Sequence, residues 1–429
     1  MNISDVREEN DSNRDLHVYD EKKLTVLTDD GDCDGHNNGD GAASKEDAKT
    51  ANSSFLHSVI NMTWPIINSI GLGKGWMGIF FRSHRVWGIM CIHLRLLGKC
   101  IKKDEKIKSY PDIGNHAFGS TGKIVATTFI YMEVFMAPVS FTIALNDNLA
   151  TVFDGKHLHI SWTHLSTTKF LTIVAVIVAM PTLWLKDLSK ISFLSVVAFG
   201  GVKANRSIPV FRLQYIPAIS GLYVFSFSAH VVAPNLYRAM KDPSKFTKVS
   251  VVSFTIVTIF YGTIALVGAK LFGPDVKLQI TLNMPKHLII TKIALWATVL
   301  APLTKYAFAI VPAASLYDRK LPSSMSSKAR LVIRGAIGSM LLMFVLILAL
   351  AVPYFEQVLG LTGSLVSISL SIIFPCAFYA KMFWSQISYP SLVLNVILIV
   401  LSSILGVLGT ISSSKSLVSI FVKKSANAS

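Results

Sequence analysis

Long apolar stretches, interrupted by short polar segments, fill the chain from about residue 54 onward. An α-helix rises about 1.5 Å per residue, so about 20 apolar residues cross the ~30 Å hydrocarbon core of a bilayer. Stretches of that length that lack Asp, Glu, Lys and Arg altogether are 213–237, 249–269, 357–380 and 382–414. Each of them predicts a transmembrane helix.

Four further stretches have the same character with one imperfection, which is either a short length or a single ionisable group. They are 124–146 with Glu133, 170–185, 293–317 with Lys305, and 331–354 with Arg334 near one end. A long basic side chain near a helix end can extend to the membrane surface. We therefore predict a transmembrane helix in each of these stretches as well.

Three weaker candidates are 55–73, which holds Asn68, then 76–98 and 191–202. Residues 76–98 include three arginines and two histidines, and each charge near a helix centre costs about 2.5–3.5 kcal/mol on insertion. Residues 191–202 give only 12 charge-free positions. Taken together, the pattern predicts an all-α polytopic membrane protein with about 9–11 transmembrane helices.

Composition and charge support this class and divide the chain. Only 15% of the residues are charged, against about 25% in a soluble domain. The formal charge of +16 hides a split, because residues 1–50 hold 14 acids and 6 bases. We expect a disordered acidic cytosolic tail at 1–53, a transmembrane domain at 54–414 and a short C-terminal tail at 415–429.

The remaining basic residues are too sparse for a nucleic-acid surface and gather in the loops at 99–108, 238–248 and 319–330. The positive-inside rule places these loops, and the N-terminus, in the cytosol. The four cysteines have no spacing typical of a zinc site, and no residue set suggests covalent catalysis, so we predict neither an enzyme nor a bound cofactor. The predicted partner is the lipid bilayer.

Three ionisable residues within predicted spans are candidates for chemistry, because such residues are retained against an insertion cost. For Glu133 the alternatives are a proton acceptor, an ion-pair partner, or a protonated or hydrogen-bonded structural carboxyl. For Lys305 they are coupling of substrate or ion, extension to the membrane surface, or pairing with another helix. His230, shortly before Pro234, marks a broken helix that presents backbone groups to a ligand, or a simple kink. The serine-rich stretches at 363–371 and 402–416 favour close helix packing over chemistry.

An ordered series of motifs resembles the plant vacuolar amino-acid transporter (AVT) family, in the amino acid/auxin permease group. The series covers roughly residues 53–411. In chain order it includes Tyr110-Pro111-Asp112-Ile113-Gly114, Tyr131-Met132-Glu133, Asp147-Asn148-Leu149, Pro181-Thr182-Leu183-Trp184, Pro234-Asn235-Leu236-Tyr237, Leu282-Asn283-Met284-Pro285, Thr304-Lys305-Tyr306 and Phe374-Pro375-Cys376.

The resemblance implies a leucine-transporter-like inverted repeat, with a midplane site beside broken first and sixth helices. It implies secondary active transport of neutral amino acids, driven by a proton gradient through alternating access, in the vacuolar membrane or else the plasma membrane. The implied substrate-binding residues are Asn68, Tyr131, Tyr223, Ser226, Ser228, Thr304 and Tyr306, and the implied proton-coupling residues are Glu133, His230 and Lys305.

Three helices depart from the family pattern. The first lacks the family's glycine-rich substrate motif near Asn68, the second carries arginine and histidine where the family is apolar, and the fifth stops at Val202. These departures leave open an incomplete first repeat. The alternative hypothesis is a transport-inactive degenerate paralogue or membrane scaffold.

Overall fold

The computed structural model describes residues 76–154, 166–181, 216–272, 277, 279–318 and 325–426. For 76–86 and some positions within helices, Thr304 and Lys305 among them, it describes the backbone but not the side chain. The predicted tail at 1–53, the weak spans at 55–73 and 191–202, and Asn68 lie outside the described residues. The first and fifth helices of the predicted repeat are therefore not described.

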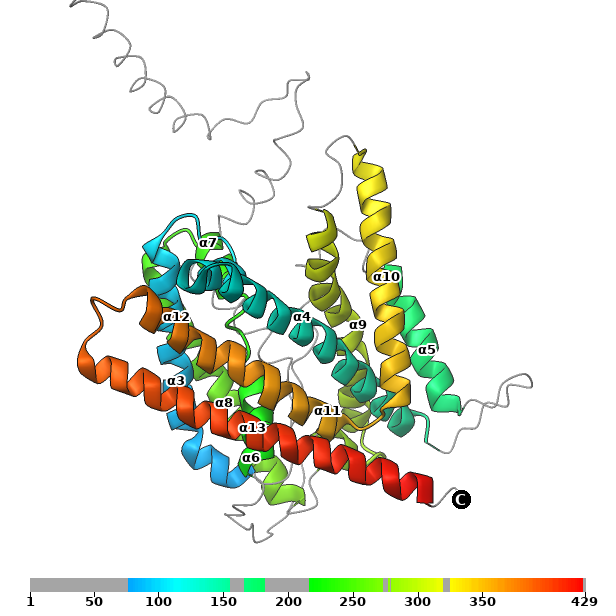
Figure 1. The fold of residues 1–429 in the computed structure, drawn as a ribbon. Coiled ribbons are helices and arrows are strands. Elements are labelled where there is room, and N and C mark those ends of the chain that lie inside the picture. The colour runs from blue at the N-terminus through cyan, green and yellow to red at the C-terminus, as the bar shows by residue number, and fades with distance from the viewer. Residues whose placement is uncertain are drawn as a thin grey trace, which may run out of the picture. The chain divides into compact units, whose positions relative to one another are not determined.

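Helices make up the described part of the chain, and no β-strand occurs in it (Figure 1). In chain order they are α3 (Trp76–Lys103), α4 (Tyr110–Val152), α5 (Thr167–Ala179), α6 (Ile216–Ser226), α7 (Ala233–Ala239), η3 (Pro243–Lys245), α8 (Phe246–Phe272), η5 (Ile280–Asn283), α9 (Ile289–Asp318), α10 (Ser327–Ala351), α11 (Phe355–Leu361), η6 (Thr362–Ser367), η7 (Ser369–Ile373), α12 (Phe374–Met382) and α13 (Tyr389–Ala426).

Within these residues, five helical stretches are long and apolar enough to cross a membrane: Tyr110–Val152, Pro243–Ile264, Lys328–Ala351, Phe355–Met382 and Tyr389–Lys423. The predicted all-α polytopic membrane class is confirmed. Helix α13 continues through Ser414 to Ala426, so most of the predicted C-terminal tail is helical.

Helix α4 begins at Tyr110, before the predicted span, because polar residues form its N-terminal turn. The Asp112 carboxylate accepts hydrogen bonds from the backbone nitrogen (2.8 Å) and the hydroxyl (2.7 Å) of Ser109, which fixes the first turn. The helix kinks at Gly119, whose φ of 62° is readily adopted only by glycine. The apolar part that follows is the predicted span 124–146.

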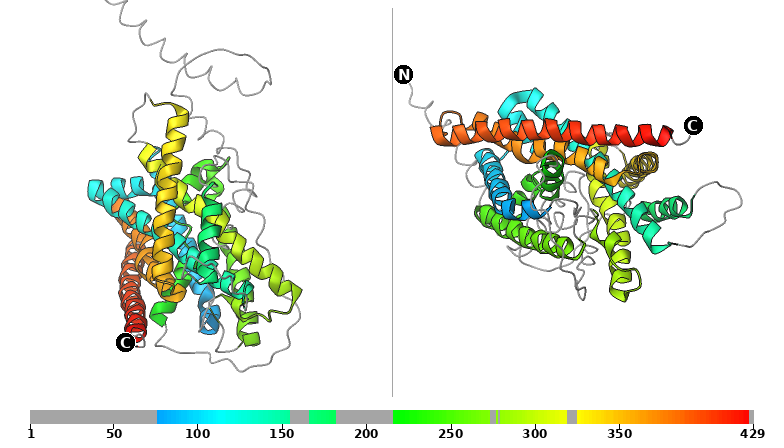
Figure 2. Two further views of the ribbon diagram at one scale, coloured as in Figure 1. Left: turned by 90° about the vertical axis from the view of Figure 1, so that its right-hand side faces the viewer. Right: turned by 90° about the horizontal axis from the view of Figure 1, so that it is seen from below.

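Two hydrophobic clusters hold the described helices together. One joins α3, α6, α7, α8 and α12 around side chains such as Phe227 and Phe254. The other joins the second half of α4 to α5, α9 and α10, and includes Tyr306. Helix α4 contributes to both clusters, and α13 runs alongside α11 and α12 in the views of Figure 1 and Figure 2.

Candidate functional site

The predicted break in the sixth span lies at residues 227–232, between α6 and α7. Pro234, in the first turn of α7, has no amide hydrogen to continue a helix across the gap. At the end of α6 the backbone hydrogen bonds span three residues instead of four; for example, Phe227 N donates to the Val224 carbonyl (3.0 Å). The Tyr261 hydroxyl of α8 donates to the Ser226 carbonyl (3.3 Å). The segment therefore holds backbone groups outside regular helical bonding.

Glu133 of α4 meets this break directly. The Ser228 hydroxyl donates a hydrogen bond to its Oε1 atom. Both side chains are partly buried. An acidic residue from one helix and the broken segment of another, far apart in sequence, thus form one polar centre, and the structure brings together two of the residues predicted from sequence.

His230 lies in the same break and is fully buried. Its ring stacks on Phe254 of α8, with centroids 6.1 Å apart. His93 of α3, also fully buried, lies within electrostatic range of His230. The His93 imidazole has no hydrogen-bond partner among the described residues, and the His230 ring lies next to the Met90 backbone of α3. In the sequence, His93 counted only among the residues that disfavour membrane insertion of 76–98. No sequence pattern indicated that it lies near His230.

Tyr223 and Ser226 border the break from α6. The Tyr223 ring packs on Phe227, with centroids 5.1 Å apart, and is buried. The Ser226 hydroxyl donates to the Leu222 carbonyl of its own helix (3.1 Å). Tyr223 therefore contributes an aromatic wall next to the break, whereas the Ser226 hydroxyl is bonded within α6.

Tyr306 and Tyr131 lie apart from this centre. The Thr142 hydroxyl already donates to the Pro138 carbonyl (2.9 Å), so the Tyr306 hydroxyl donates to Thr142 across 2.8 Å. Thr142 is nine residues beyond Glu133, which is about 14 Å along a helix. Tyr131 is 39% exposed and lies on a different side of α4 from Glu133.

Polar residues join different helices at the two ends of α4. At its C-terminal end, Asn148 donates to the Gln279 side chain (2.5 Å), and its Oδ1 accepts from Thr281 (3.3 Å) and Thr298 (3.0 Å). We call these four residues the Asn148 cluster. It links α4 to η5, to α9 and to the segment before η5.

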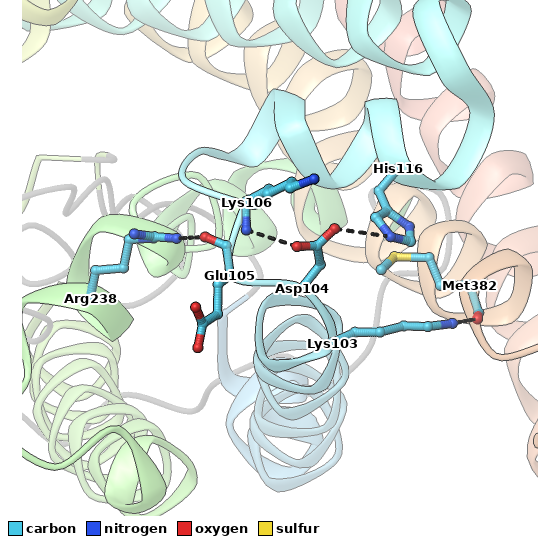
Figure 3. Close-up of polar contacts among 7 residues, drawn as sticks. All are labelled: Lys103, Asp104, Glu105, Lys106, His116, Arg238 and Met382. Atoms are coloured by element: carbon cyan, nitrogen blue, oxygen red, sulfur yellow. Dashed lines mark hydrogen bonds and ion pairs between the residues drawn. The ribbon is translucent and has the colours of Figure 1, made fainter. Parts of the chain in front are cut away.

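At the N-terminal end of α4, the α3–α4 loop is held by neighbouring helices, as Figure 3 shows. Arg238, at the end of α7, donates to the Ile107 carbonyl from Nε (3.1 Å) and Nη2 (3.0 Å), and to the Glu105 carbonyl. Lys103 donates to the Met382 carbonyl of α12. We call these five residues the Arg238 cluster. It connects the end of α7 to the loop that leads into α4, and the end of α3 to α12.

Long apolar helices around a carboxylate, a hydroxyl and a broken helix are typical of membrane transporters. Comparison with known proteins identifies the family. The chain belongs to the transmembrane amino acid transporter protein family, whose model matches residues 67–415.

Plant relatives of this family are similar over most of their length. The amino acid transporter AVT1H of Arabidopsis thaliana is 49% identical over 404 residues, which cover 88% of this chain and 93% of that protein. The amino acid transporter AVT1E of the same plant is 33% identical and covers 79% of this chain and 67% of its own length. The vesicular inhibitory amino acid transporter of Xenopus tropicalis is 24% identical, with coverage of 82% and 73%. The predicted AVT resemblance is confirmed.

Proposed function

We propose that the protein is a secondary active transporter of neutral amino acids in the vacuolar membrane, driven by a proton gradient. The observation that carries this function is the hydrogen bond between Ser228 in the α6–α7 break and Glu133 of α4. When the carboxyl group of Glu133 changes between its charged and neutral forms, the strength of its hydrogen bond with Ser228 changes. Because Ser228 lies in the α6–α7 break, the change acts on the broken helix. Proton binding and the conformation of the substrate site would then be linked.

The surroundings of the break favour a neutral amino acid. Backbone groups at 227–232 offer partners for the polar ammonium and carboxylate groups of an amino acid. Phe227 and Tyr223 provide an apolar, aromatic surface. A charged substrate side chain placed against these rings would lose its hydration without a counter-charge.

Alternating access is supported by the two polar clusters at the ends of α4. The Arg238 cluster and the Asn148 cluster each connect separate helices through a few hydrogen bonds. Such bonds contribute about 1 kcal/mol each, so one end can be released without unfolding the apolar clusters between them. With the basic loops in the cytosol, the Arg238 cluster faces the cytosolic side.

The test is uptake of labelled neutral amino acids into proteoliposomes under an imposed pH gradient. We expect accumulation that collapses when the gradient is dissipated, and we expect Glu133→Gln to abolish the gradient-driven part. Glu356→Gln is the matched control, because Glu356 is an exposed residue in the first turn of α11. A folded wild-type protein without gradient-dependent flux would refute the proposal and favour the transport-inactive paralogue.

A further inference from the structure

The helical stretch 362–373 carries three buried serine hydroxyls without a hydrogen-bond partner among the described residues. Ser364, Ser367 and Ser371 are exposed by 1%, 0% and 0% respectively. They lie three and four residues apart along this π-helical stretch. We call them the serine track.

Serine in an apolar helix normally donates its hydroxyl to the carbonyl four residues earlier. Two neighbours in the same stretch do so: Thr362 donates to Val358 and Ser369 donates to Leu365, each at 2.8 Å. The serine track is different. Its hydroxyls retain their capacity to donate and accept while they are removed from bulk water.

Close packing explains the small size of these side chains but not their hydroxyl groups. A Cβ added to Gly221 of α6 would collide with Ser364, and one added to Gly363 would collide with the Gly221 backbone, so the two helices are in intimate contact. Alanine would pack equally well in such an interface. An unpaired buried hydroxyl is energetically unfavourable in such an interface. Packing alone therefore gives no reason for serine in place of alanine at these positions.

The backbone of this stretch is also irregular. Residues Thr362–Ser367 and Ser369–Ile373 form wide π-helical turns. π-helical turns occur preferentially at functional sites, because they shift side chains out of the regular register and leave carbonyl groups available. Here both π-helical turns, which carry the serine track, contact α4.

The middle of the track faces Glu133. The Ser367 hydroxyl lies beside the Glu133 carboxylate, without reaching hydrogen-bonding geometry with it or with another described group. One residue before Ser371, the Leu370 carbonyl accepts a hydrogen bond from Tyr110 (2.6 Å), the first residue of α4. The track therefore runs from the α6 contact past Glu133 towards the N-terminal end of α4.

We propose that Ser371 and Ser367, bridged by water, form the route by which protons move between Glu133 and the N-terminal end of α4. In each step a hydroxyl or water oxygen accepts one proton and passes another to the next oxygen, so every serine is regenerated. The last transfer converts the Glu133 carboxylate to a carboxylic acid. This inference rests on the proposed proton-driven transport.

Three of the titratable groups around the track are poor proton acceptors at neutral pH. They are the phenol of Tyr110, the thiol of Cys376 on α12 and the thiol of Cys100 on α3. Each is normally neutral at pH 7 and becomes negative only on losing a proton. His230 of the break can also accept a proton, but Ser367 and Ser228 both adjoin Glu133, so Glu133 is the acceptor at the end of the track.

The experiment compares Ser367→Ala/Ser371→Ala with Ser369→Ala in proteoliposomes. Ser369 belongs to the same π-helical stretch, but its hydroxyl is bonded within the helix. Two rates are measured for each protein: amino-acid uptake driven by a pH gradient, and amino-acid exchange at equal pH on both sides. Exchange needs a folded protein and an intact substrate site but no net proton movement.

We expect the double variant to lose gradient-driven uptake by about tenfold or more, the loss that follows when a positioned proton-transfer group is removed. Its exchange activity should persist, and Ser369→Ala should retain both activities. Wild-type levels of gradient-driven uptake in the double variant would overturn the serine route while leaving the proposed function intact. A wild-type protein without amino-acid flux would instead refute the proposed function, and the route with it.

Discussion

Arg238 provides the sharpest test of how the broken helix is connected to one end of the molecule. Its guanidinium group donates to the carbonyl of Ile107 and to that of Glu105, the contact drawn in Figure 3, and so joins the end of α7 to the α3–α4 loop. The change Arg238→Ala removes all of these bonds. Backbone hydrogen bonds that order this loop itself, such as Ile107 N to the Asp104 carbonyl (3.1 Å), remain.

The expected magnitude follows from the number and exposure of the bonds. A hydrogen bond from a charged donor contributes about 1.5–3 kcal/mol when buried, and much less when solvent screens it. Arg238 is an exposed residue and its contact with Glu105 is exposed, whereas its two bonds to Ile107 are partly buried, so we assign about 2 kcal/mol to the whole set. That corresponds to about a 30-fold increase in the population of the open loop.

Hydrogen exchange of the backbone amides at 104–109 measures this opening. We expect faster exchange in Arg238→Ala, a smaller increase in Arg238→Lys because lysine lacks the planar fork, and no change in Lys241→Ala. Lys241 is an exposed base of the same loop region and serves as the control for lost charge. Equal exchange in Arg238→Ala and Lys241→Ala would refute the idea that these bonds close the loop.

Three further predictions concern stability, each measured by thermal unfolding. Tyr306→Phe should cost about 1 kcal/mol, because Thr142 loses its donor but keeps its own bond to Pro138; an unchanged midpoint would contradict this. Gly221→Ala should destabilise by about 1–3 kcal/mol through its collision with Ser364, whereas Gly88→Ala, with open space around it, should not. Hydrogen bonds from Ser244 and Lys245 lower the pKa of Asp242 from 3.8. The stability lost in Asp242→Ala should therefore be largest above pH 3.8 and should vanish as the pH falls through the lowered pKa.

The helical class and most span positions could be predicted because hydrophobic length is a strong local signal. The break at 227–232 was also foreseen as one of two alternatives, since Pro234 limits the helix locally. The bounds of α4 and α13 were not, because polar capping at Ser109 and helical continuation past Lys415 do not depend on hydropathy.

The site was predictable only in part, because its contacts depend on tertiary packing. Glu133 and His230 stood out as ionisable residues in apolar spans, which is a local property. The pairing of Glu133 with Ser228, the approach of His93 to His230 and the unpaired hydroxyl of Ser367 require four parts of the chain to meet: α3, α4, the α6–α7 break and η6. No spacing along the chain encodes such a meeting.

Helix α3 shows how the misplaced charges of the second span are accommodated. Met90, Leu94 and Leu97 are buried on one side, together with His93, whereas Arg95 is exposed on another. The arginine therefore does not interrupt the face that packs on α8, where Trp87 donates to Thr255 (3.2 Å). Arg95 is also about 12 Å from the C-terminal end of α3, a distance that a long basic side chain partly spans to reach the membrane surface.

Because α3 is too polar to be stable alone in a bilayer, its place there depends on α8. The same two helices enclose His230: Phe254 of α8 stacks on its ring, and His93 of α3 approaches it from the other helix. Packing of α3 against α8 therefore also encloses the α6–α7 break. His93, one of the polar residues of the second span, thus lies at a contact beside the candidate site.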